Sequence, residues 1–152
     1  MNKSILIVED CKTQATQLQT LLESNGYDTL VAENGKVGLD MAMETTPTLI
    51  LSDIVMPVMD GYQMCKKIKS MENFLDVPVI LLTSLSDPED VIKALECHAD
   101  NFVTKPYEQK LLLSRIEHVL INRELRGKRQ PENRADIFFS GRKYRITSDP
   151  TQ

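Results

Sequence analysis

The stretch LILSDIVMPVMDG, residues 49–61, decides the fold because it predicts a buried strand that ends on an acid. Residues 49–52 are mostly apolar, Asp53 interrupts them, and the Asp60-Gly61 pair predicts a turn. Burying an uncompensated charge costs several kcal/mol. Asp53 therefore either caps a helix or has a chemical role with partners elsewhere in the chain.

Short apolar runs like this one recur along the chain and alternate with amphipathic stretches. The apolar runs predict five strands, at 3–8, 27–32, 48–52, 77–83 and 101–104. Apolar residues at helical spacing predict the intervening helices, at 12–25, 35–45, 61–71, from an Asp87 N-cap through Pro88 onward, and at 108–126. Alternating units of this length predict an α/β fold, a flavodoxin-like doubly wound five-stranded parallel sheet of order 2-1-3-4-5 with helices on both faces.

The amino-acid composition limits which classes of protein this chain can belong to. The chain has 152 residues, of which 41% are hydrophobic and 26% charged, as expected for a globular domain. No apolar run approaches the ~20 residues of a membrane span, and the N-terminus lacks a signal peptide, so we expect a cytoplasmic protein without membrane association. Cys11, Cys65 and Cys97 have no CxxC spacing, which favours buried reduced thiols over disulfides or zinc.

The charge is unevenly distributed. Residues 1–126 carry 12 Lys+Arg against 19 Asp+Glu, a balance of −7, whereas residues 127–152 carry 6 against 3, a balance of +3. An acidic first part is a poor match for a phosphate backbone, so we expect no direct nucleic-acid binding by this chain.

Polar residues stand at the carboxyl end of four predicted strands. Glu9 and Asp10 follow the first, Asp53 the third, Thr83 ends the fourth and Lys105 follows the fifth. Because strands 1 and 3 are neighbours in this order, three carboxylates should meet at the ligand-binding edge of the sheet. Such carboxylates repel one another unless a cation joins them, and hard oxygen ligands suit Mg²⁺.

This set suggests a role for Asp53. A carboxylate can act as a covalent nucleophile toward phosphorus, and the metal and Lys105 would stabilise charge on the transferred group. An isolated Asp after a strand is as often a helix cap, but the ordered set of five polar residues favours the chemical interpretation.

Four motifs follow one another along the chain, ILIVED, LILSDIVMPVMDGY, VPVILLTS and ADNFVTKPY. Together they resemble the receiver domain of bacterial two-component response regulators over about residues 3–122. The resemblance implies that Asp53 is the phosphoacceptor, that Thr83 and Lys105 contact the phosphoryl group, and that Phe102 is the switch aromatic residue. It also implies a cis peptide before Pro106. The implied ligands of Mg²⁺ are Glu9 through water, Asp10, Asp53 and the main-chain carbonyl of Val55.

The resemblance also implies a function. The chain would be a phosphorylation-controlled signalling module, not an enzyme beyond its own phosphorylation and dephosphorylation. The phosphoryl group would come from a sensor histidine kinase or a histidine phosphotransfer protein. The output surface would combine the helix from Pro88, strand 101–104 and helix 108–126, and could form a homodimer. By the same resemblance, the apolar side chains of Val55 and Leu85 would flank the path of water to the phosphoryl group, which predicts slow self-dephosphorylation.

Two positions depart from the family pattern. His98 replaces a usual Gly, and Gly38 replaces a usual Ala, at a cost of roughly 1 kcal/mol if exposed.

Two other functions are disfavoured. A haloacid-dehalogenase-type phosphatase would carry its nucleophile in a DxDx(T/V) motif after the first strand, but this chain has VEDCK there and its candidate nucleophile follows the third strand. A flavin-binding module would need a Ser/Thr/Gly-rich phosphate cradle, which the loops after the first and third strands lack.

The tail is expected to be separate from the receiver domain, which we assign to residues 1–122. Residues 123–152 predict the end of the long helix, a polar linker and a short β-hairpin around Ser140-Gly141. A lone two-stranded hairpin is marginal in water. The hairpin would therefore pack on the receiver, pair with another chain, or begin a further domain. We expect the last of these, which makes the chain a fragment of a larger hybrid kinase or multidomain regulator.

Overall fold

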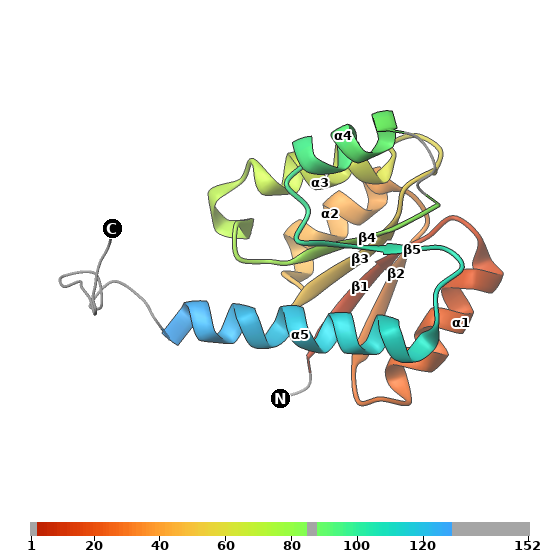
Figure 1. The fold of residues 1–152 in the computed structure, drawn as a ribbon, viewed down its shortest axis with the longest axis vertical. Coiled ribbons are helices and arrows are strands. Elements are labelled where there is room, and N and C mark those ends of the chain that lie inside the picture. Colours follow the sequence, from red (N-terminus) through yellow and green to blue (C-terminus); the bar gives the residue numbers. More distant parts are fainter. Residues whose placement is uncertain (1–2, 85–87, 129–152) are drawn as a thin grey trace. The chain divides into compact units, whose positions relative to one another are not determined.

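A five-stranded parallel sheet forms the centre of the fold in this computed structural model, which describes residues 3–84 and 88–128. Its order is β2-β1-β3-β4-β5, as the sequence predicts (Figure 1). The strands are β1 Ser4–Val8, β2 Asp28–Ala32, β3 Leu49–Asp53, β4 Val79–Thr83 and β5 Asn101–Thr104. The predicted flavodoxin-like fold class is confirmed.

Helices cover both faces of the sheet. The described residues form five α-helices, which are α1 Lys12–Glu23, α2 Gly35–Thr45, α3 Gly61–Lys69, α4 Pro88–Glu96 and α5 Gln109–Lys128. Figure 1 shows α2, α3 and α4 on one face and α1 and the first part of α5 on the other. A short 3₁₀ helix, η1 Glu72–Phe74, follows α3 and was not predicted, since three residues carry no periodic signal.

The core is split by the sheet into two layers. Alternate residues of β1 point to opposite faces, so Leu6 and Val8 join the layer under α2 and α3, whereas Ile5 and Ile7 join the layer under α1 and α5. Every residue of β4 and the first four of β3 are buried. Burial on both faces explains why these strands are continuous apolar runs in the sequence.

Element boundaries differ from the prediction by at most two residues. Asp53 is the last residue of β3 rather than the residue after it, and it stands opposite Leu82 of β4. β4 begins at Val79, two residues later than predicted. The predicted N-cap Asp87 lies outside the described residues.

Gly38 is buried, so the predicted penalty for an exposed glycine does not apply. A Cβ at this position of α2 would lie 2.9 Å from Val8 Cγ2 and 3.0 Å from Met64 Sδ. Glycine therefore lets α2 approach β1 and α3 closely. His98 has the left-handed conformation expected of the glycine it replaces, with φ of 61°.

The cysteines are free in the described part of the chain, as predicted, although only two of the three are buried. Cys65 and Cys97 lie in the core, whereas Cys11 is exposed at the beginning of α1. Among the described residues, no helix is both long and apolar enough to cross a membrane.

The chain divides into two compact units, Met1–Leu120 and Ile121–Gln152. Within the first unit, α5 contributes buried side chains to the core, Leu112, Ile116, Val119 and Leu120. The hairpin predicted around Ser140-Gly141 lies outside the described residues. The domain boundary at 122 stays a prediction.

Candidate functional site

Three carboxylates meet at the carboxyl edge of the sheet. Glu9 and Asp10 follow β1, and Asp53 ends β3. β1 and β3 are hydrogen-bonded neighbours with Val8 opposite Ser52, so the residues that follow them lie together. One oxygen from each carboxylate falls within 4.8 Å of the others. The predicted acidic cluster is present.

Lys105 supplies a positive charge to this cluster. Its Nζ lies 3.0 Å from Asp53 Oδ1 and 3.8 Å from Glu9 Oε1. Its main-chain N–H donates to the carbonyl of Thr83 at 2.7 Å, which fixes the residue at the end of β5. The Lys105-Pro106 peptide is cis, as the resemblance implies. One ammonium against three carboxylates leaves the cluster with a negative balance.

Glu9 is the most buried member of the cluster. Its Oε2 accepts a hydrogen bond from the Cys11 N–H at 3.2 Å, but its buried Oε1 has no hydrogen-bond partner. Burial, reinforced by the nearby charge of Asp53, raises the pKa of Glu9 to about 7. A buried carboxylate oxygen without a donor, beside two more carboxylates, fits a hard divalent cation such as Mg²⁺.

Asp53 is held by its neighbours but stays accessible. Its Oδ1 accepts from the Ile54 N–H at 2.9 Å, and its side chain is 15% exposed. Two glycines fix the loop that follows. A Cβ on Gly61 would overlap the Asp53 carbonyl oxygen, and a Cβ on Gly35 would overlap the Met59 carbonyl oxygen. The Gly35 N–H donates to that same Met59 carbonyl at 3.0 Å.

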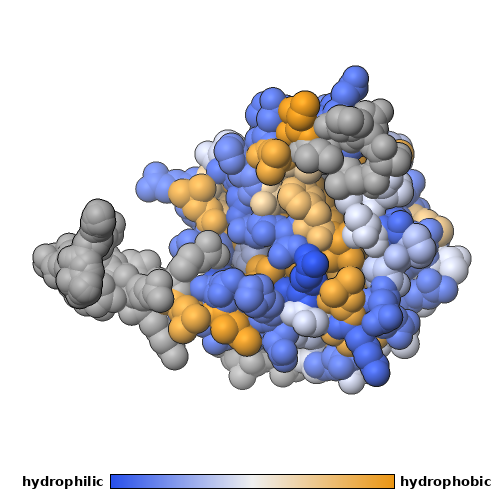
Figure 2. Space-filling view, viewed as in Figure 1, coloured by the Kyte–Doolittle hydropathy of each residue, from blue (hydrophilic) through white to orange (hydrophobic). Residues whose placement is uncertain are grey.

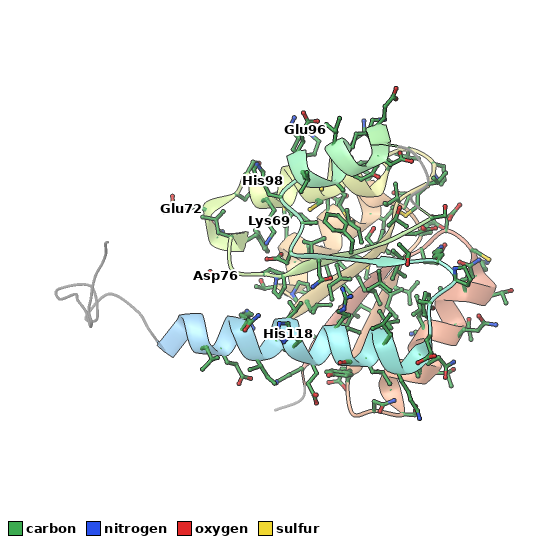
Figure 3. The ribbon with its side chains drawn as sticks, in the orientation of Figure 1. Lys69, Glu72, Asp76, Glu96, His98 and His118 are labelled. Carbon is green, nitrogen blue, oxygen red and sulfur yellow. The ribbon has the colours of Figure 1, made fainter. Side chains whose placement is uncertain are left out.

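The other predicted residues are arranged around this cluster. Thr83 is buried at the end of β4, one residue beyond the position opposite Asp53. Phe102 of β5 is half-buried and packs against the core layer under α2 and α3. Val55 is 81% exposed, two residues after Asp53. His98 and His118 are exposed and belong to separate parts of the fold, after α4 and on α5 (Figure 3).

Sequence reasoning missed two polar residues near the site. Gln14 Oε1 accepts a hydrogen bond from Lys105 Nζ at 3.2 Å, and Tyr62 donates one to the main-chain carbonyl of Asp90 at 3.3 Å. Gln14 lies in the first turn of α1, which begins two residues after Asp10, so its nearness to the cluster could have been inferred from the sequence. Nothing in the sequence connects Tyr62 with Asp90, because the contact depends on how α3 packs against α4.

A comparison with known protein families identifies the family to which this site belongs. Residues 5–117 match the response regulator receiver domain. The chain belongs to the receiver domain family. All the predicted site residues of this receiver, Glu9, Asp10, Asp53, Val55, Thr83, Phe102 and Lys105, fall within the matched range.

Relatives of this receiver are signalling proteins. It is 42% identical over 120 residues to histidine kinase P4 of Formosa agariphila, covering 79% of this chain and 9% of that protein. It is 34% identical to the alkaline phosphatase synthesis transcriptional regulatory protein PhoP of Bacillus subtilis, covering 82% of this chain and 51% of that protein. The chain thus spans about half or less of the length of these relatives.

A solved structure supports the same assignment. The receiver is similar to the signal receiver domain of a signal transduction histidine kinase from Syntrophus aciditrophicus, with 46% identity and a TM-score of 0.77. The match covers 79% of this chain and 91% of the solved one.

Proposed function

We propose that this receiver domain accepts a phosphoryl group on Asp53 from the phosphohistidine of a sensor histidine kinase or histidine phosphotransfer protein. The observation that carries the proposal is the 3.0 Å contact between Lys105 Nζ and Asp53 Oδ1 within the acidic cluster. A partly exposed carboxylate beside a fixed ammonium is placed to attack phosphorus while the charge on the transferred oxygens is balanced.

The transfer exchanges one bond to phosphorus for another. A carboxylate oxygen of Asp53 forms the new O–P bond, the P–N bond to the donor histidine breaks, and the imidazole nitrogen retains the bonding pair and takes up a proton. The ammonium of Lys105 pairs with the free carboxylate before the transfer and with the phosphoryl oxygens after it. The Thr83 hydroxyl donates a hydrogen bond to one of these oxygens. Mg²⁺ held by Glu9, Asp10, Asp53 and the Val55 carbonyl would add positive charge at the phosphoryl oxygens.

The partner would approach from the side of α1. A cavity of about 1040 Å³ lies between α1 and the turn after β5, lined by Gln14, Gln17, Leu21, Lys105 and Tyr107 among others. Because Lys105 both lines this cavity and contacts Asp53, a helix carrying a phosphohistidine would rest there and present its imidazole to Asp53. Apart from this exchange, we propose no further substrate, and the chain would act as a signalling module.

Phosphorylation would change the surface formed by α4, β5 and α5. Thr83 would move toward the phosphoryl group, and Phe102 would turn inward. Ile92 and Leu95 of α4 are exposed by 55% and 67%, and Figure 2 shows apolar side chains at the surface over this helix. We propose this surface as the contact for a second receiver in a homodimer, and expect its hydrogen exchange to change when beryllofluoride and Mg²⁺ mimic phosphorylation.

Acetyl phosphate with Mg²⁺ provides the direct test. Intact mass should show one added phosphoryl group on the wild-type protein and none on Asp53→Asn. Asp60→Asn is the matched control, because Asp60 caps α3 through the Gln63 N–H and an Asn side chain can do the same. If Asp53→Asn were labelled at the wild-type rate, Asp53 would not be the acceptor.

A phosphatase of the haloacid-dehalogenase type is disfavoured, because the proposed nucleophile Asp53 ends β3. Its nucleophile would follow β1, where Glu9 is buried and Asp10 is exposed. Steady turnover of acetyl phosphate by Asp53→Asn, abolished in Asp10→Asn, would support that function instead.

A further inference from the structure

The amide of Gln14, which the proposed phosphoryl transfer does not use, contacts the ammonium of Lys105. Gln14 lies in the first turn of α1, and its Oε1 accepts a hydrogen bond from Lys105 Nζ at 3.2 Å. The same Nζ lies 3.0 Å from Asp53 Oδ1. An ammonium can only donate hydrogen bonds, so the carbonyl oxygen of the amide is the atom that faces it. Two acceptors, one on α1 and one at the end of β3, therefore fix the position of Nζ.

A third acceptor lies close to this ammonium but beyond hydrogen-bonding distance. Glu9 Oε1 is 3.8 Å from Lys105 Nζ, and this buried oxygen has no hydrogen-bond partner among the described residues. A buried carboxylate oxygen without a donor is unfavourable, and a lysine ammonium has three hydrogens on a flexible stem. Elementary electrostatics would bring the two together, so the longer distance needs a physical cause.

The contact with Asp53 would not by itself keep the ammonium away from Glu9. One oxygen of Asp53 and one of Glu9 lie within 4.8 Å of each other. An ammonium at ordinary hydrogen-bonding distance from both oxygens spans a gap of that size. If Asp53 were its only anchor, Nζ would pivot about that contact and bridge the two carboxylates. The hydrogen bond to Gln14 supplies a second anchor on a different element, which opposes the pivot.

We propose that Gln14 is a positioning residue that holds the Lys105 ammonium away from Glu9 and so leaves Glu9 Oε1 open to hydrated Mg²⁺. A bridging ammonium and a divalent cation would compete for the same carboxylate oxygens. Gln14 keeps Lys105 beside Asp53, where the phosphoryl group arrives, and keeps the metal side of the cluster free. The inference rests on the proposed metal site and adds a residue that touches neither the metal nor the phosphoryl group.

Gln14→Met isolates the amide oxygen, because Met has an unbranched side chain of similar length and its thioether accepts hydrogen bonds only weakly. A titration with Mg²⁺ alone, followed through backbone amide NMR signals, should give a dissociation constant about fivefold higher than that of wild type, the equivalent of ~1 kcal/mol.

Gln17→Met is the matched control for this titration. Gln17 is also exposed on α1 and lines the same cavity as Gln14, but among the described residues it does not hydrogen-bond to Lys105. The control should bind Mg²⁺ with wild-type affinity.

A double-mutant cycle tests whether Gln14 acts through Lys105. Lys105→Met has no ammonium to hold, so adding Gln14→Met to it should leave the dissociation constant of Mg²⁺ unchanged. A purely structural role of Gln14 in α1 would instead weaken Mg²⁺ binding equally in both backgrounds. Acetyl phosphate gives a second readout, because Gln14→Met should be labelled more slowly than wild type at low Mg²⁺ and at the wild-type rate when Mg²⁺ is saturating.

Wild-type Mg²⁺ affinity in Gln14→Met would overturn the inference. An equal loss of affinity in Gln17→Met, an equal loss in the Lys105→Met background, or slow labelling of Gln14→Met at saturating Mg²⁺ would also overturn it. Wild type separates the two proposals. If wild type binds Mg²⁺ and is labelled on Asp53, a failure of the Gln14 results concerns Gln14 alone. If wild type binds no Mg²⁺, the proposed metal site is wrong and the inference falls with it.

Discussion

At the scale of single residues, Val58 is the most strained position in the loop after Asp53. Its φ is 70°, and the Met59 N–H donates to the Pro57 carbonyl across it at 2.7 Å. A β-branched residue in the left-handed region is a genuine outlier, and such strain tends to gather at functional loops. The side chain is 80% exposed, so it gains nothing from packing in return.

Val58→Asn should therefore stabilise the protein. Asn tolerates the left-handed conformation, so the free energy of unfolding should rise by ~1 kcal/mol. Urea denaturation followed by circular dichroism measures the change. Val55→Asn, at an equally exposed position that has no positive φ, should stay within about 0.5 kcal/mol of wild type. Equal effects of the two substitutions would show that Val58 is not strained.

The lifetime of the phosphorylated state is a second prediction at this scale. Val55 is exposed beside Asp53, and Leu85, its predicted counterpart, lies outside the described residues. An apolar side chain cannot orient a water molecule in line with the phosphorus, so hydrolysis should be slow. After removal of the phosphodonor, phosphoprotein should decay faster in Val55→Asn with Leu85→Glu than in wild type. Equal decay rates would mean that these side chains do not set the lifetime.

At the scale of elements, a buried ion pair joins the end of α3 to two strands. Lys69 Nζ lies 2.7 Å from Asp100 Oδ2, and the Lys69 side chain is only 7% exposed (Figure 3). Lys69 also donates to the Val77 carbonyl at 2.9 Å. Asp100 accepts from the Val79 N–H at 2.8 Å and, through its own N–H, donates to the Val79 carbonyl. The pair thus fixes the beginnings of β4 and β5 relative to α3.

Lys69→Met should cost ~3 kcal/mol of stability, because it leaves the charge of Asp100 partly buried without its partner. Thermal or urea unfolding measures the loss. Lys67→Met is the matched control on the same helix, since Lys67 is exposed and its replacement should change stability by less than about 0.5 kcal/mol. A cost no larger than that of Lys67→Met would show that the ion pair does not hold these elements together.

At the scale of the whole molecule, the acidic cluster should couple metal binding to stability. Mg²⁺ that binds the folded state alone raises the melting temperature by mass action, by roughly 5–10 °C at a hundredfold excess over its dissociation constant. Asp10→Ala should lose most of this shift. Asp40→Ala should keep it, because Asp40 pairs with Lys36 on the surface of α2. A Mg²⁺ shift that survives intact in Asp10→Ala, or is absent in wild type, would contradict the proposed metal site.

The strand order and the meeting of Glu9, Asp10, Asp53 and Lys105 were predictable from the sequence. Alternating apolar runs and helical periods determine a doubly wound sheet, and a parallel sheet brings the carboxyl ends of its strands to one edge. A polar residue placed directly after a strand is then located by topology alone. The same rule predicts that Thr83, at the end of β4, lies on the same edge of the sheet as the cluster.

Tertiary packing alone decided the contacts between residues that no topological rule relates. Lys69 and Asp100, or Tyr62 and Asp90, are about thirty residues apart and meet because α3 lies against β4 and α4 at a particular depth and rotation. Gly38 likewise is unfavourable for a helix when judged from the sequence alone. Its advantage is that the missing Cβ lets α2 pack closely against Val8 and Met64, which only the structure shows. Periodicity fixes which face of a helix is buried, whereas the side-chain volumes of all its neighbours together fix how close it comes and which polar groups it meets.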